Sequence, residues 1–237
     1  MNLQSLKKDI RVRGTAARAR VSLRFFKTGK GEYGEGDRFL GLTMGEQREI
    51  AKRYRDLDFS ALEKLLGSLW HEERMIGLLI LVFRYERAKT LAEKREVFDF
   101  YIAHRSAANN WDLVDVTTPN IVGDFLSGRN DRGMLFRFAR SNNLWERRMA
   151  IIATLACIRN GDFGTTLEIA TRFLDDTHDL IHKATGWMLR ETGKKNTAVL
   201  VSFLEKYAPR MPRTMLRSAI EKFPPEERRR FLEMKRM

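Results

Sequence analysis

An acidic pair beside a tryptophan is the feature of this sequence best suited to chemistry. In Asn110-Trp111-Asp112-Leu113-Val114-Asp115, carboxylates stand where the other tryptophan-containing segments carry Arg or Lys. On a helix, Asp115 lies four residues after Trp111, so the two side chains share a face. An acid in a first helical turn, favoured by the helix dipole, explains Asp112 and is the plainer alternative for Asp115. An acid pair on an otherwise basic helical surface is what a DNA-directed hydrolase would need.

The four tryptophans recur at a regular interval. Trp70, Trp111, Trp145 and Trp187 are separated by 41, 34 and 42 residues, and each lies near the start of, or inside, a helix-like apolar segment. Trp187 also lies three residues after Ala184, which makes a core position the plainer expectation for this side chain.

Basic positions repeat at a similar interval. Arg74 and Arg148 are 74 residues apart, two steps of 37, and Lys183 follows Arg148 by 35 residues. A period in this range with two helices per unit is typical of a HEAT-type solenoid, whereas an ordinary helical bundle gives no reason for it. We predict an all-α fold, a curved right-handed solenoid of about six antiparallel helix pairs, forming one HEAT-like domain over residues 1–237.

Helical periodicity dominates, and no convincing strand alternation is present. Three pairs have the capping-box spacing that marks a helix start: Thr43 with Glu46, Ser60 with Glu63, and Asn143 with Glu146. Gly193 is predicted to end a helix. The expected helices are 3–13, 15–27, 44–56, 60–68, 71–86, 89–104, 111–127, 132–140, 144–159, 163–175, 178–192, 196–207, 212–222 and 225–234.

Residues 28–37 form a glycine-rich loop with Tyr33 at its centre. Neither the Gly-Lys-Ser/Thr ending nor the preceding strand of a Walker loop is present. The loop is either a flexible surface linker or a backbone lip that approaches phosphates closely because it lacks side chains.

Composition favours a polyanionic partner. The chain has 237 residues and a net charge of +13, from 44 Lys and Arg against 31 Asp and Glu. Cys157 is the only cysteine and lies among apolar residues, so we expect a buried thiol, no disulfide and no cysteine-based zinc site. His71-Glu72-Glu73 lacks the second histidine of a zincin helix, and we predict neither metal nor cofactor. The apolar run 75–83 is too short to cross a bilayer and no secretory signal is evident, so we expect a cytoplasmic protein.

Four motifs together give the chain a family resemblance from about residue 20 to residue 223. They are Arg38-Phe39-Leu40-Gly41, Trp111-Asp112-Leu113-Val114-Asp115, Leu144-Trp145-Glu146-Arg147-Arg148 and Lys183-Ala184-Thr185-Gly186-Trp187-Met188-Leu189-Arg190-Glu191. With them the chain resembles the AlkD-type DNA alkylation repair glycosylases, which are built from HEAT-like repeats. The resemblance implies a functional set of Trp111, Asp115, Arg148 and Trp187.

The implied substrate is double-stranded DNA with a cationic N3- or N7-alkylated purine. Asp115 is expected to stabilise the oxocarbenium-like sugar and to assist the attacking water. Trp111 and Trp187 would present π faces to the cationic nucleotide, and Arg148 would hold a backbone phosphate. Further DNA contacts are expected from Arg74, Lys183, Arg190, Arg213, Arg217 and Tyr33.

Two other interpretations are compatible with the sequence. A non-catalytic HEAT module that binds bent or branched DNA needs the basic groove but gives no reason for Asp115 beside Trp111. A protein-binding solenoid is disfavoured by the positive charge unless its partner is acidic. For the leading interpretation we expect a monomer without an obligate protein partner and without a membrane partner.

Overall fold

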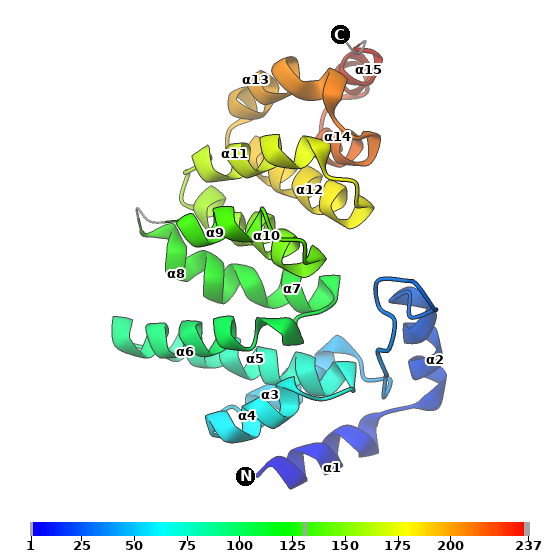
Figure 1. Cartoon of the computed structure of the whole chain (residues 1–237), viewed down its shortest axis with the longest axis vertical. Coiled ribbons are helices and arrows are strands. Elements are labelled where there is room, and N and C mark those ends of the chain that lie inside the picture. The colour runs from blue at the N-terminus through cyan, green and yellow to red at the C-terminus, as the bar shows by residue number, and fades with distance from the viewer. Residues whose placement is uncertain (1, 130–131, 235–237) are drawn as a thin grey trace. The chain divides into compact units, whose positions relative to one another are not determined.

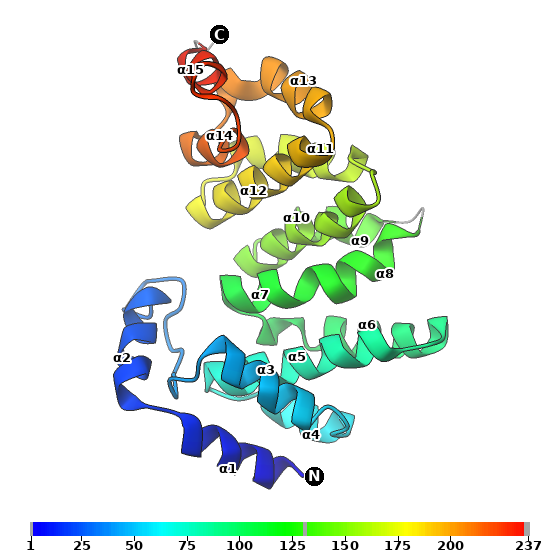
Figure 2. The ribbon, with the colours of Figure 1, turned by 180° about the vertical axis from the view of Figure 1, so that it is seen from behind.

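The computed structural model describes residues 2–129 and 132–234, and its regular structure is helical (Figures 1 and 2). Within these residues there is no strand, only a single bridge between Arg38 and Trp70. The predicted all-α class is therefore confirmed. The chain divides into two compact units, one ending at Thr117 and the other beginning at Thr118. The solenoid arrangement, the number of helix pairs and the single domain stay predictions.

Unit 1 is organised around the apolar helix α5 (His71–Arg87). Its residues from His71 to Val82 are all buried, because α3, α4 and α6 pack around it. A helix that is apolar over most of its circumference is expected to lie inside the core in this way. The other elements of unit 1 are α1 (Leu3–Arg13), α2 (Ala16–Phe25), α3 (Met44–Arg53), α4 (Phe59–Leu66), α6 (Leu91–Ala103), η1 (Arg105–Ala107) and α7 (Trp111–Thr118).

Unit 2 is organised around α10 (Leu144–Arg159) and α12 (Asp179–Lys195). These two helices pack against each other, and α12 also packs against α14, α11 and α13. Burial of Met188 and Leu189 on α12 and of Ile151 and Ile152 on α10 forms the core. The other elements are η2 (Pro119–Gly123), α8 (Asp124–Ser127), α9 (Gly133–Phe138), α11 (Gly164–Arg172), η3 (Phe173–Asp175), α13 (Thr197–Tyr207), η4 (Ala208–Arg210), α14 (Arg213–Ala219) and α15 (Pro225–Glu233).

Two of the three predicted helix starts are confirmed. Thr43 and Glu46 form a reciprocal capping box, and the side chain of Asn143 accepts from the first backbone N–H groups of α10. The start predicted at Ser60 is wrong, because Asp58 caps α4 instead. The helix stop predicted at Gly193 is also wrong, since α12 continues to Lys195. A Cβ at Gly193 would lie 2.4 Å from a methyl carbon of Leu200, so this glycine admits a close neighbour.

Pro119 occurs inside a continuous helical stretch. The α-helical turns of α7 give way at Pro119 to the π-helical turns of η2, and α8 follows directly. A proline has no backbone N–H and its ring crowds the preceding turn, so a local widening of the helix accommodates it. The predicted helix 111–127 is thus present with a changed hydrogen-bonding pattern at its centre. No helix in the described ranges has the length and apolar character needed to span a membrane.

Candidate functional site

Helix α7 presents Trp111 and Asp115 at its partly exposed side. Both side chains are half-buried, whereas Asp112, Leu113 and Val114 between them are buried. The predicted sharing of one face by Trp111 and Asp115 follows from their spacing of one helical turn. Leu113 and Val114 anchor the helix in the core, and Trp111 and Asp115 keep part of their surface exposed.

Two adjacent phenylalanines pack against Trp111, and one of them links it to a wider aromatic cluster. The ring of Phe26 stacks on Trp111 at 5.3 Å, and the ring of Phe25 meets it edge-on at 5.5 Å. Phe26 also stacks on Phe39 at 5.1 Å and lies 4.9 Å from the ring of His71. This cluster orients the indole. Local sequence patterns do not predict it, because its members are far apart in the chain.

His71 connects the glycine loop to the start of α7. Its Nδ1 lies 3.0 Å from Oδ2 of Asp37 and its Nε2 lies 2.9 Å from Oδ2 of Asp112. Burial alone would lower the pKa of His71, but the hydrogen bonds and charges of Asp112 and Asp37 raise it to about 9. His71 is therefore an imidazolium at neutral pH, and it donates to both carboxylates.

Asp112 lies in the first turn of α7, as expected. It has a second role as well, because it is only 8% exposed and accepts a hydrogen bond from His71. Asp37, at the end of the glycine loop, is equally buried. Burial would raise the pKa of Asp37, yet the hydrogen bond from His71 and the charge of Arg74 hold it below the usual value.

Arg74 completes this buried network rather than facing solvent. It is 5% exposed and forms an ion pair with Asp37 through Nη2. Its other nitrogen atoms donate to the carbonyls of Ala107 at 3.2 Å and Ser68 at 2.9 Å, and Nη2 also reaches Asn109. With so little of its side chain exposed, Arg74 is poorly placed for the expected phosphate contact. A buried ion pair with its hydrogen bonds satisfied explains the residue instead.

The two glutamates that follow His71 fasten the N-terminal segments to α5. The carboxylate of Glu72 accepts from the backbone N–H groups of Leu40 at 2.9 Å and Gly41 at 2.7 Å. Glu73 accepts no aligned hydrogen bond within the described residues, but its Oε2 lies 2.9 Å from Nζ of Lys7. Among the described residues no three His, Cys, Asp or Glu side chains are grouped to hold a metal ion.

The glycine loop is a series of hydrogen-bonded turns rather than a flexible linker. Glu32 accepts from the backbone N–H of Gly29 and Glu35 from that of Gly31, each at 2.8 Å. A Cβ on Gly34 would lie 2.3 Å from the carbonyl oxygen of Phe26, so the chain can close here only around a glycine. Tyr33 is half-buried. The loop's own carboxylates thus occupy two of the N–H groups that a phosphate would need.

The other two expected residues belong to unit 2. Arg148, on α10, is 5% exposed, and its Nη1 donates to the carbonyl oxygen of Leu180 in the first turn of α12. Trp187, on α12, is half-buried, and its Nε1 donates to Glu191 at 3.1 Å. Trp187 therefore keeps an accessible surface, whereas most of the Arg148 guanidinium is enclosed.

The expected phosphate-binding cations of unit 2 differ in accessibility. Lys183, Arg213 and Arg217 are exposed. Nζ of Lys183 lies 2.7 Å from Asp179, and Arg213 donates to the carbonyl of Leu232 at 2.7 Å. Arg190 is half-buried and ion-paired with Glu221. The exposed members are the ones that can meet a phosphate without a rearrangement of the core.

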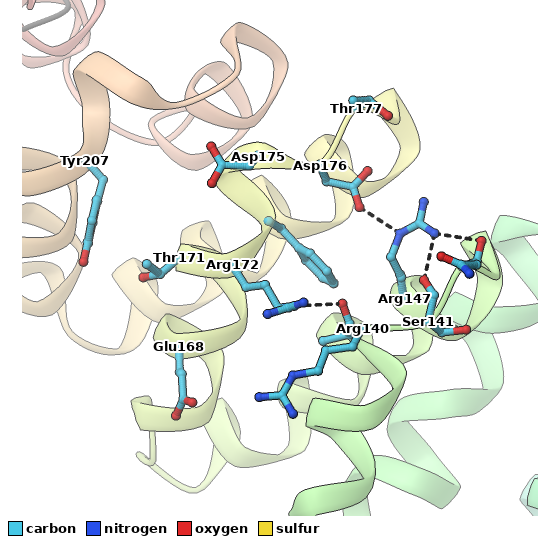
Figure 3. Close-up of a pocket in the computed structure, with 13 residues that line it drawn as sticks. Arg140, Ser141, Arg147, Glu168, Thr171, Arg172, Asp175, Asp176, Thr177 and Tyr207 are labelled. Atoms are coloured by element: carbon cyan, nitrogen blue, oxygen red, sulfur yellow. Dashed lines mark hydrogen bonds and ion pairs between the residues drawn. The ribbon is translucent and has the colours of Figure 1, made fainter.

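A cavity of about 880 Å³ opens in unit 2 between the end of α9, α11 and Tyr207 (Figure 3). Arg147 crosses one side of it, paired with Asp176 at 2.8 Å, and Arg172 donates to the carbonyl of Ala139. None of the residues predicted to act on DNA lines this cavity. It is therefore separate from the predicted site.

Comparison with known proteins agrees with the resemblance seen in the sequence. The model of the DNA alkylation repair enzyme family matches residues 6–223. A solved structure, described as a predicted DNA alkylation repair enzyme from Enterococcus faecalis, is similar in fold, with a TM-score of 0.69 and 15% identity over 90% of this chain and 98% of that one. No curated protein matches the chain. The match of the family model over almost the whole length establishes that this chain belongs to the DNA alkylation repair enzyme family.

Proposed function

We propose that the protein is a monofunctional DNA glycosylase that hydrolyses the N-glycosidic bond of cationic N3- and N7-alkylated purines. The observation that carries this proposal is the placement of Asp115 and Trp111, half-exposed and one turn apart on a helix whose other acid, Asp112, is buried and ion-paired. Membership of the DNA alkylation repair enzyme family and the net charge of +13 support DNA as the partner.

The proposed reaction needs little help at the leaving group. When the bond between C1′ and the purine nitrogen breaks, its electron pair neutralises the cationic base, so no general acid is required. Positive charge then develops on the deoxyribose, as in glycoside hydrolysis. The Asp115 carboxylate would stabilise that charge and accept a proton as water bonds to C1′. The products are the neutral alkylated base and an abasic sugar.

The tryptophans would bind the cationic nucleotide through their ring faces. Such an interaction contributes about 0.5–2 kcal/mol for each ring. Trp111 is suited to this because Phe26 stacks on it and Phe25 meets it edge-on. Trp187 is suited because its indole N–H is bound by Glu191. For Arg148 we propose a supporting role, since its burial against Leu180 ties α10 to α12 and leaves little guanidinium surface for a phosphate.

Phosphate contacts are assigned to the exposed cations of unit 2. These cations are Lys183, Arg213 and Arg217. Their phosphate contacts would not depend on the base sequence and would position the duplex by charge alone. Unlike Arg74, they can reach a phosphate without leaving a buried partner unpaired, and unlike Arg148 they are not enclosed by the protein. We further propose that the protein acts as a monomer, with the helix pairs arranged as a solenoid along the duplex.

Release of free base from methylated duplex DNA tests the proposal. The wild-type protein is expected to liberate 7-methylguanine from methylated duplex and to leave unmodified guanine in place. Trapping with borohydride should give no protein–DNA cross-link, because a glycosylase without a lyase step forms no Schiff base. Tight, salt-sensitive DNA binding without base release would support a non-catalytic DNA-binding module instead.

A further inference from the structure

Helix α2 and the end of α1 expose large apolar side chains to solvent. Of the six large apolar side chains exposed among the described residues, four lie between positions 12 and 25: Val12, Val21, Leu23 and Phe25. No residue of α2 is buried. Both views of the fold show α2 set to one side of α3, α4, α5 and α6 (Figures 1 and 2). An exposed apolar cluster of this kind marks an interaction surface.

The exposed side of α2 is formed by two adjacent rows. Val21 and Phe25, one turn apart, are 68% and 61% exposed. Arg20 and Arg24 form the neighbouring row, and both are exposed with no ion pair to any described residue. The opposite side, including Phe26, is partly buried. Of the adjacent residues Phe25 and Phe26, it is therefore Phe25 that faces outward together with the arginines.

Charge identifies the kind of partner. Residues 10–31 contain seven Arg or Lys and no Asp or Glu. The apolar row also leads to the candidate site, because the ring of Phe25 meets the edge of Trp111. Apolar side chains flanked by Arg are typical of proteins that press against the sugar edges of a DNA groove while cations hold the phosphates. An anionic bilayer would match the charge but would not explain the contact with Trp111.

We propose that α2 is a duplex-binding element, in which Arg20 and Arg24 contact phosphates and Val21 and Phe25 pack against the sugars next to the nucleotide at Trp111. This inference rests on the proposed function only in that the partner is DNA. It adds a contact surface outside the residues that the family motifs cover.

Fluorescence anisotropy with an unmodified duplex at stepped salt concentrations tests the two rows separately. Arg20→Ala with Arg24→Ala is expected to weaken binding at least 10-fold at low salt. The slope of log affinity against log salt concentration should become shallower by about 2, because each of the two lost phosphate contacts contributes about 0.9. Val21→Ser with Phe25→Ser is expected to weaken binding about 10-fold with an unchanged slope. Circular dichroism should show all variants folded, since α2 has no buried residue.

Control variants remove the same charge, and one exposed apolar side chain, elsewhere in the protein. Arg228→Ala with Arg229→Ala, both exposed on α15, should change affinity less than about 2-fold if the charge effect is local. Leu91 is 61% exposed on α6, and Leu91→Ser should leave binding unchanged. If wild type and both α2 variants bound the duplex with equal affinity, the role of α2 would be wrong, while the proposed function would be unaffected.

Two further outcomes separate the alternatives. If the α2 variants lose binding to phosphatidylglycerol vesicles while keeping full duplex affinity, the partner is a bilayer and the inference is wrong. If the wild-type protein binds no duplex, both this inference and the proposed function are wrong. If duplex binding depends on α2 but no base is released, only the glycosylase proposal fails.

Discussion

The Nε2 atom of His71 lies 2.9 Å from Oδ2 of Asp112, the residue that follows Trp111. Through Nδ1 the same ring holds Asp37, and its face stacks on Phe39 at 4.6 Å. One buried imidazolium thus joins the end of the glycine loop to the start of the helix that carries Asp115. A charged residue with two carboxylate partners is costly to bury unless every partner is kept, so these three residues should behave as a unit.

The first prediction concerns the pH dependence of stability. The pKa of His71 is raised from 6.5 to about 9, so its stabilising contribution is complete below pH 6.5 and is lost as the pH rises through 9. The full loss is expected to be about 3 kcal/mol. Urea unfolding from pH 6 to 9.5 measures it, with His71→Gln expected to remove most of this dependence. Parallel pH profiles for the two proteins would contradict the assignment.

The second prediction separates buried from exposed arginines. Arg74→Ala should lower the free energy of unfolding by about 3–5 kcal/mol, because Asp37 loses a buried partner. Arg217→Ala should change it by less than about 0.5 kcal/mol and should instead weaken duplex binding, with a salt slope shallower by about 1. If Arg74→Ala were as stable as wild type and only bound DNA less tightly, Arg74 would be a phosphate contact after all.

The third prediction concerns the close approach of α12 and α14. A Cβ on Gly186 would lie 2.4 Å from the carbonyl oxygen of Met215, so Gly186→Ala must force the two helices apart. We expect Gly186→Ala to lower the free energy of unfolding by about 1–3 kcal/mol. Gly128→Ala is the control, because nothing lies within 4 Å of a Cβ there. Equal thermal stability of the two variants would show that the helices can separate freely.

Much of the helical framework was predictable because it depends on local signals. The range predicted for α10, 144–159, matches the observed Leu144–Arg159, since Asn143 caps its start and apolar residues repeat at the helical period. The prediction failed where packing between helices accounts for a residue. Gly193 looks like a helix stop in the sequence, but it lies inside α12, where its missing side chain leaves room for Leu200 of α13.

The candidate site was predictable only in part for the same reason. Trp111 and Asp115 are separated by one turn of a helix, so their common face follows from spacing. The network of His71 joins residues 34 and 41 positions away, and no local pattern encodes it. One signal was present: the run His71 to Arg74 directly precedes the apolar residues of a helix with no polar side. Polar residues at the start of such a helix must be buried, and therefore paired.

The rate of 7-methylguanine release by Asp115→Asn, measured beside its affinity for duplex DNA, tests the central claim most directly. The substitution removes the charge and keeps the shape, so we predict a rate about 100- to 1000-fold lower with the affinity unchanged. Asp124→Asn, an exposed acid on α8, is the control and should release base at the wild-type rate. Release by Asp115→Asn at the wild-type rate would contradict the assignment of Asp115 as the catalytic carboxylate.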